Sequence, residues 1–129
     1  MLLSIHKTFL ISAALLLGTA GCTTLSPAGK EYDSFAAYAE AVFRHQNDLT
    51  SRLMALTEAE QLTDDEPLEK AEQAMSDACY LLNEYAEMQN EGETPGLFFQ
   101  RKVQASVEEC DQKIEQLEAL MTSVKKPPL

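Results

Sequence analysis

Apolar residues recur every three or four positions from about residue 33 almost to the C-terminus, which is the spacing of helices that bury one face. Ala, Glu, Gln, Leu and Met dominate this stretch, and no run alternates β-branched with polar residues as a half-buried strand would. The pattern therefore predicts an all-α fold. The stripe of the first helix consists of Phe35, Tyr38, Ala39, Val42, Gln46, Leu49, Leu53 and Leu56.

Capping and breaking residues indicate where the first helix begins and ends. Asp33 and Ser34 are both good N-terminal caps, so we expect the helix to begin at one of them. It should end before residue 63, because the acidic segment 63–66 followed by Pro67 is typical of the start of a new helix.

Similar capping and breaking residues indicate the ends of the other two helices. The second should run to about Glu91 and end at Gly92, since glycine is favoured just past a helix. Residues 94–95, a Thr-Pro pair, should open the third. Its predicted end is at Lys125 and Lys126, whose charges suit the negative end of a helix dipole.

Two cysteines give the register of the second and third helices. Facing residues of an antiparallel hairpin have numbers with a constant sum, and pairing Cys79 with Cys110 places the midpoint between Thr94 and Pro95, inside the expected turn. We therefore predict a Cys79–Cys110 disulfide, with two buried free thiols as the alternative. The same register makes every further rung apolar on both sides, as in a bundle seam: Leu82 with Val107, Ala86 with Val103, Met75 with Ile114, and Leu68 with Met121.

A second apolar stripe on the second helix needs a partner, and the first helix can supply it. The prediction is an up-down-up three-helix bundle over residues 31–126, with one disulfide between the second and third helices. A tail follows at residues 127–129. The stripe consists of Ala74, Ala78, Leu81, Tyr85 and Met88.

The first 22 residues differ from the rest. Lys7 precedes an apolar run over residues 9–17, and residues 18–21 (Gly-Thr-Ala-Gly) lead into Cys22. This arrangement resembles the leader of a bacterial lipoprotein, in which a peptidase cuts before the cysteine and the cysteine then carries the lipid. The run is shorter than the roughly 20 apolar residues that span a membrane. Secretion after cleavage at Ala20 and a retained anchor are the alternatives.

The resemblance implies how the chain is divided and where the protein is located. Residues 1–21 would be the signal peptide and 22–30 a lipid-anchored linker, leaving a mature chain of 108 residues, enough for one small domain. Lipid on Cys22 would leave an even number of cysteines in an oxidising compartment, where disulfides persist. Thr23, in place of an aspartate, implies sorting to the outer membrane, facing the periplasm.

Charge narrows the range of partners. Residues 22–129 contain nine Lys and Arg against twenty-one Asp and Glu, a formal charge of −12. Such a surface repels nucleic acid and anionic lipid head groups and favours basic partners. The alternative is that the acidity serves solubility alone.

The mature chain lacks the residues of common catalytic sites. His45 is its single histidine, and we expect it at the surface or at the edge of the core. The acidic segment 64–69 has no calcium-loop spacing, and no phosphate loop or nucleophile elbow occurs. We expect no enzyme activity, metal or cofactor.

The expected function is that of a membrane-anchored interaction module or assembly factor of the bacterial envelope. The mature part is similar in size, helicity and disulfide use to pilotins, small lipoproteins that escort secretion pores, by analogy only. An acidic inhibitor or immunity lipoprotein against a basic envelope protein, and a small-ligand carrier, are the alternatives. The candidate partner-binding residues are Tyr80, Asp77, Glu84 and Glu87, on the outer face of the second helix.

Aromatic residues form one further group. Tyr32, Phe35, Phe98 and Phe99 should gather at the end of the bundle nearest the membrane. We expect them to close the bottom of the core, with an exposed patch that touches lipid or a partner as the alternative.

Overall fold

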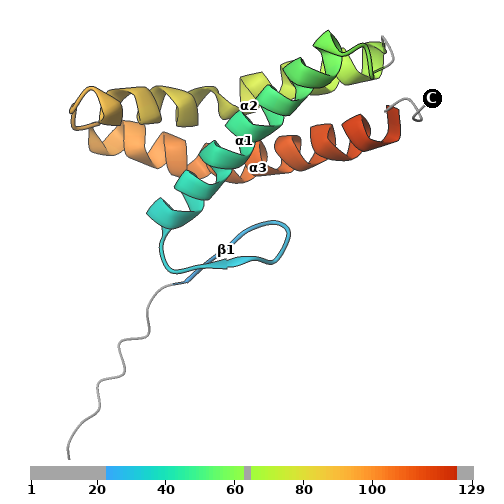
Figure 1. Cartoon of the computed structure of the whole chain (residues 1–129). Helices are drawn as coiled ribbons and strands as arrows, with labels where there is room; N and C mark the ends of the chain where they lie inside the picture. Colours follow the sequence, from blue (N-terminus) through green and yellow to red (C-terminus); the bar gives the residue numbers. More distant parts are fainter. Residues whose placement is uncertain (1–22, 63–64, 125–129) are drawn as a thin grey trace, which may run out of the picture.

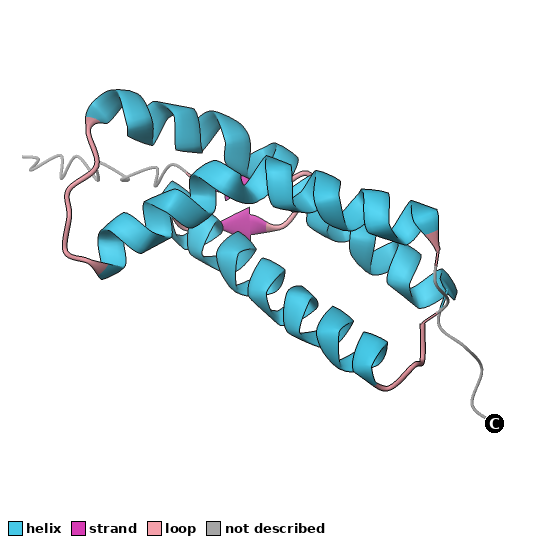
Figure 2. Cartoon of the chain, turned by 90° about the horizontal axis from the view of Figure 1, so that it is seen from above, coloured by secondary structure: helices cyan, strands magenta, loops and turns pink. Residues whose placement is uncertain are grey.

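The computed structural model describes residues 23–62 and 65–124. Three helices, α1 (Phe35–Glu58), α2 (Glu66–Asn90) and α3 (Leu97–Val124), form an up-down-up bundle, which confirms the predicted fold class (Figure 1). α2 and α3 form an antiparallel hairpin. α1 crosses this hairpin obliquely and packs mainly on α3 (Figure 1; Figure 2). Within the described residues, none of the helices combines the length and the apolar character needed to cross a membrane.

The helix boundaries follow local capping chemistry. Ser34 caps α1, and its hydroxyl accepts a hydrogen bond of 3.1 Å from the backbone N–H of Ala37. Asp65 stands at the N-cap of α2, with Pro67 in the first turn as predicted. At the other end of α2, Gly92 adopts a φ of 76°, the left-handed conformation that glycine accepts without strain.

α1 ends at Glu58, several residues before the acidic segment that was expected to stop it. The chain turns at Glu60, whose φ is 54°, and the backbone N–H of Gln61 donates to the carbonyl of Leu56 at 2.9 Å. Leu62 then returns to the core, where it is buried. The predicted end of the third helix at Lys125 and Lys126 lies outside the described residues.

The α2–α3 seam is the centre of the core and has the predicted register. Cys79 and Cys110 are both fully buried, and Ala86 is the one half-buried member of the predicted rungs. The other seam residues are buried on both sides: Leu68, Met75 and Leu82 on α2, and Val103, Val107, Ile114 and Met121 on α3.

A short β-hairpin precedes α1, where we expected only a linker. Strands β1 (Thr24–Leu25) and β2 (Glu31–Tyr32) pair antiparallel. Pro27 begins the turn between them, and Gly29, with a φ of 79°, completes it. The buried Ser26 hydroxyl accepts a hydrogen bond of 3.0 Å from the backbone N–H of Lys30. Each strand is two residues long, which is too short to produce an alternating apolar and polar pattern in the sequence.

The oblique course of α1 corrects one expectation about packing. The second stripe of α2 was expected to lie under α1, but Leu81 and Tyr85 remain only half-buried. α1 instead uses its own stripe against α3, and Tyr38, Val42, Leu49 and Leu53 are buried there. A groove is left open between α1 and α2.

Candidate functional site

The outer face of α2 carries the residues that the sequence singled out for binding. Tyr80 is 62% exposed, on the side of α2 away from the disulfide seam. Asp77 and Glu87 are exposed, and Glu84 is half-buried. Asp77 accepts a hydrogen bond of 2.8 Å from the Gln73 amide, one turn earlier. By helical spacing these side chains form one surface, in which an aromatic ring stands among three carboxylates; we call it the Tyr80 face.

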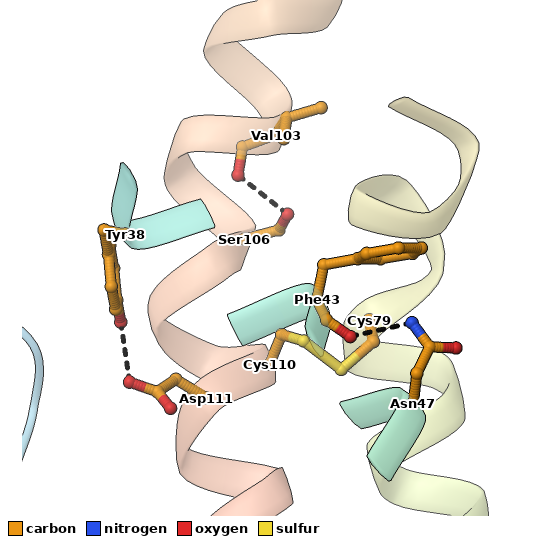
Figure 3. Close-up of a disulfide and its surroundings, with 8 residues drawn as sticks. All are labelled: Tyr38, Phe43, Asn47, Cys79, Val103, Ser106, Cys110 and Asp111. Carbon is orange, nitrogen blue, oxygen red and sulfur yellow. Dashed lines mark hydrogen bonds between the residues drawn. A yellow bond between two sulfur atoms is a disulfide. The ribbon is translucent and has the colours of Figure 1, made fainter. Parts of the chain in front are cut away.

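The disulfide fixes the helices beneath this face. The sulfur atoms of Cys79 and Cys110 are bonded at 2.05 Å, which confirms the predicted pairing and excludes the free-thiol alternative. Phe43 and Asn47 of α1 belong to the surroundings of the bond (Figure 3). Since both cysteines are fully buried, the bond is structural and is not an exposed redox group.

A buried polar pair joins α1 to α3, and sequence reasoning missed it. The Tyr38 hydroxyl donates to a carboxylate oxygen of Asp111 at 3.0 Å, next to the disulfide (Figure 3). Burial, followed by the hydrogen bond to Asp111 and its charge, raises the pKa of Tyr38 well above its ordinary value. The sequence did hold a signal for this pair: Tyr38 lies on an apolar stripe, and a tyrosine hydroxyl that is buried needs a hydrogen-bond partner.

A second polar link between α1 and α3 is half-exposed. Glu118 accepts a hydrogen bond of 2.6 Å from Arg52 and lies 3.0 Å from the Nε2 atom of His45. The hydrogen bond from Arg52 is the main cause that lowers the pKa of Glu118, while burial acts in the opposite direction. His45 is therefore at the edge of the core, as expected, in a cross-helix link.

The groove between α1 and α2 is apolar and has a volume of about 330 Å³. Three aromatic rings line it, and the hydroxyl of one of them, Tyr85, accepts a hydrogen bond of 2.8 Å from Gln89. The alanines that line the groove are small and leave this space open. The lining also includes Phe35, Phe43, Leu82 and the alanines at 36, 39 and 86.

The four aromatic residues expected at one end of the bundle separate in the structure. Tyr32, Phe35 and Phe99 pack against the core as expected, and the Tyr32 and Tyr38 rings lie 5.1 Å apart between centroids. Phe98 does not: it is 82% exposed, and Leu97 beside it is 75% exposed. The expectation that all four close the core is thus wrong for Phe98, because it sits on the outer side of the first turn of α3.

No metal-binding group of three or more His, Cys, Asp or Glu side chains occurs within residues 23–62 and 65–124. Cys22, the predicted lipidation site, lies outside the described residues. No protein-family model matches the sequence, and the searches of curated proteins and of solved structures gave no match.

Proposed function

We propose that this protein is a lipid-anchored, non-enzymatic interaction module of the bacterial envelope, and that it binds a basic partner protein through the Tyr80 face. The observation that carries the proposal is the exposed Tyr80 ring among the carboxylates of Asp77, Glu84 and Glu87. Tyrosine is enriched among binding hot spots, since its ring buries a large area at low entropic cost.

The rigidity of α2 supports this proposal. The Tyr80 face follows directly after Cys79, whose disulfide holds α2 against α3 at that point. A helix fixed in this way loses little freedom when a partner binds, so more of the interaction energy is realised as affinity. The formal charge of −12 on residues 22–129 would steer a basic partner towards the protein.

The lipid anchor is tested separately. Mass spectrometry of the membrane fraction should find a mature N-terminus at Cys22 with diacylglycerol attached, and Cys22→Ser should release the protein from the membrane. An N-terminus at Gly21, or unchanged membrane association of Cys22→Ser, would refute the anchor and leave the Tyr80 face to be judged by itself.

Binding through the Tyr80 face is tested by crosslinking in intact envelopes. Tyr80→Ala should weaken the crosslinked band several-fold, whereas Met54→Ala should not, although Met54 on α1 is equally exposed at 63%. Charge reversal of Glu84 and Glu87 should abolish the band, and reversal of Glu108 and Glu109 on α3 is the control with the same net charge. Equal effects of the two reversals would show that net charge, and not this face, governs binding.

The acidic inhibitor and the interaction module differ in their dependence on salt. An inhibitor of a basic protein should lose affinity steeply as ionic strength rises, because long-range attraction dominates its binding. A partner held mainly by contacts with the Tyr80 ring should lose less affinity over the same rise in ionic strength.

A small-ligand carrier is a second candidate, and the apolar groove between α1 and α2 favours it. If the groove holds a ligand, native mass spectrometry of protein purified from its own envelope should detect a bound apolar molecule. Ala86→Leu, which would fill the groove, should remove that molecule and leave partner crosslinking unchanged. Unliganded protein would count against the carrier.

A further inference from the structure

The end of the helical hairpin carries an exposed apolar pair. Leu97 and Phe98 are 75% and 82% exposed, more than any other large apolar side chain of the described residues. Isolated exposed apolar residues are common on protein surfaces. These two are consecutive in the first turn of α3, so together they expose an amount of apolar surface that isolated residues such as Met54 do not.

Positive charge follows this pair at helical spacing. Arg101 and Lys102 lie three and four residues after Phe98, on the same side of α3, and both are exposed. Neither forms an ion pair within the described part of the chain, and the same holds for Lys30 and Lys113. In a protein with this excess of acid, two adjacent unpaired cations beside an exposed ring form a distinct chemical environment, which we call the hairpin tip (Leu97, Phe98, Arg101 and Lys102).

The tip lies towards the end of the bundle at which α1 begins, while the β-hairpin next to the proposed anchor lies beside the middle of α3, where Lys30 and Asp111 line the same hollow. The α2–α3 turn and the start of α1 lie towards the same end of the bundle, opposite the C-terminal end of α3 (Figure 1). β1 begins at Thr24, two residues after Cys22, so the lipid-bearing residue would be at most about 7 Å along the chain from the hairpin. An anchor this short would hold the folded body against the membrane surface.

We infer that the hairpin tip is a second membrane contact, which inserts Phe98 and Leu97 into the interface of a phospholipid bilayer while Arg101 and Lys102 bind the head-group phosphates. The inference rests on the proposed lipid anchor. Aromatic and aliphatic side chains next to cations are typical of segments that lie in the membrane interface. The exposed acids Glu91 and Glu93, on the α2 side of the turn, limit the attraction to an anionic surface, and zwitterionic lipids offer them ammonium groups.

The chain contains no tryptophan, so a single introduced one reports on its own surroundings. Full-length lipidated Phe98→Trp would be reconstituted into phosphatidylcholine vesicles, with and without a minor share of phosphatidylglycerol, containing brominated acyl chains as quenchers. The emission of Phe98→Trp should shift to the blue and be quenched several-fold more than that of Tyr80→Trp, the exposed control. Adding Arg101→Glu with Lys102→Glu should reduce the quenching, whereas adding Lys70→Glu with Lys113→Glu, the same change in net charge, should not.

Two results would overturn the inference and are distinguishable from failure of the anchor. Wild-type protein that does not sediment with vesicles would refute the anchor itself. If Phe98→Trp sediments but its indole stays as exposed to solvent as the indole of Tyr80→Trp, the tip contact alone is refuted. Protection of the Phe98→Trp indole that needs an added envelope protein would assign the tip to a protein partner and would also overturn the inference.

Discussion

The hydroxyl of Tyr38 on α1 donates a 3.0 Å hydrogen bond to the carboxylate of Asp111 on α3, 73 residues further along the chain, and both residues are buried. The raised pKa of Tyr38 means that the hydroxyl keeps its proton, and hence its role as donor, at neutral and mildly alkaline pH. This bond is the only one with both side chains buried between α1 and α3 among the described residues, so it selects one position of α1 over others of similar apolar packing.

Tyr38→Phe is expected to lower the free energy of unfolding by about 1–3 kcal/mol, because the buried Asp111 side chain would lose its hydrogen-bond donor. Adding Asp111→Val should recover much of that loss, since apolar replacement of both partners leaves no unsatisfied polar group. Urea unfolding of the single and double variants measures the coupling. Strictly additive losses would show that the bond contributes nothing beyond packing.

Removal of the disulfide should lower the free energy of unfolding more than loss of the Tyr38–Asp111 hydrogen bond does. The bond closes a loop with a sequence separation of 31 residues, which corresponds to about 3–4 kcal/mol in the chain-entropy model. Cys79→Ser and Cys110→Ser are each expected to destabilise the domain by about 2–5 kcal/mol. Peptide mapping without reductant should recover both cysteines in one crosslinked fragment. Two thiols that alkylate freely in protein isolated without reductant would contradict the pairing.

Gln46 occupies a core position of α1, and its Oε1 atom is buried without a hydrogen-bond partner in the described part of the structure. Gln46→Leu is therefore expected to raise the free energy of unfolding by about 1 kcal/mol, because it removes an unsatisfied acceptor from an apolar site. Thermal unfolding measures the change, and Gln104→Leu on the exposed side of α3 is the matched control. A loss of stability in Gln46→Leu would indicate that the amide has a partner, such as an ordered water.

Glu118 should make stability depend on acid pH. Its pKa in the folded protein is lowered from the ordinary 4.5, chiefly by the hydrogen bond from Arg52. The stabilisation is therefore fully present above about pH 4.5 and is lost as pH falls through the lowered folded-state value. Since the carboxylate is partly exposed, the effect should stay below about 1 kcal/mol.

Glu118→Gln tests this dependence. The difference in unfolding free energy between wild type and Glu118→Gln should be largest near neutral pH and shrink under acid conditions. Glu109→Gln, at an exposed position of α3, is the control. A difference that does not change with pH would assign the effect to packing of the side chain.

The parts of the fold that could be predicted share one physical basis. Helical spacing, caps and the arithmetic of two cysteines depend on local sequence or on a single long-range pair, and the register of α2 against α3 followed from Cys79 and Cys110. The position of Tyr80 on an outer face followed from the same register. Each of these needs only the geometry of one helix or one hairpin.

The parts that could not be predicted depend on how whole elements meet. The crossing of α1 over the hairpin decides that Leu81 and Tyr85 stay half-buried, and the apolar stripe of α1 allows several crossings. The partnership of Tyr38 with Asp111 exists only at one of them. Phe98 and Phe99 are neighbours of the same chemistry, so only the final direction of α3 distinguishes the exposed ring from the packed one.

The covalent connection of two helices, and not of the third, has a consequence for how the molecule opens. A disulfide between α2 and α3 keeps those helices in register even when their ends fray, whereas α1 is held to them only by the one segment that leads into α2 and by non-covalent packing. Partial opening should therefore begin with α1 lifting from the hairpin as one cooperative unit. Amide hydrogens of α1 would exchange with solvent through this opening, and those around Cys79 and Cys110 only through global unfolding, so that the least protected helix is the one that follows the proposed membrane anchor.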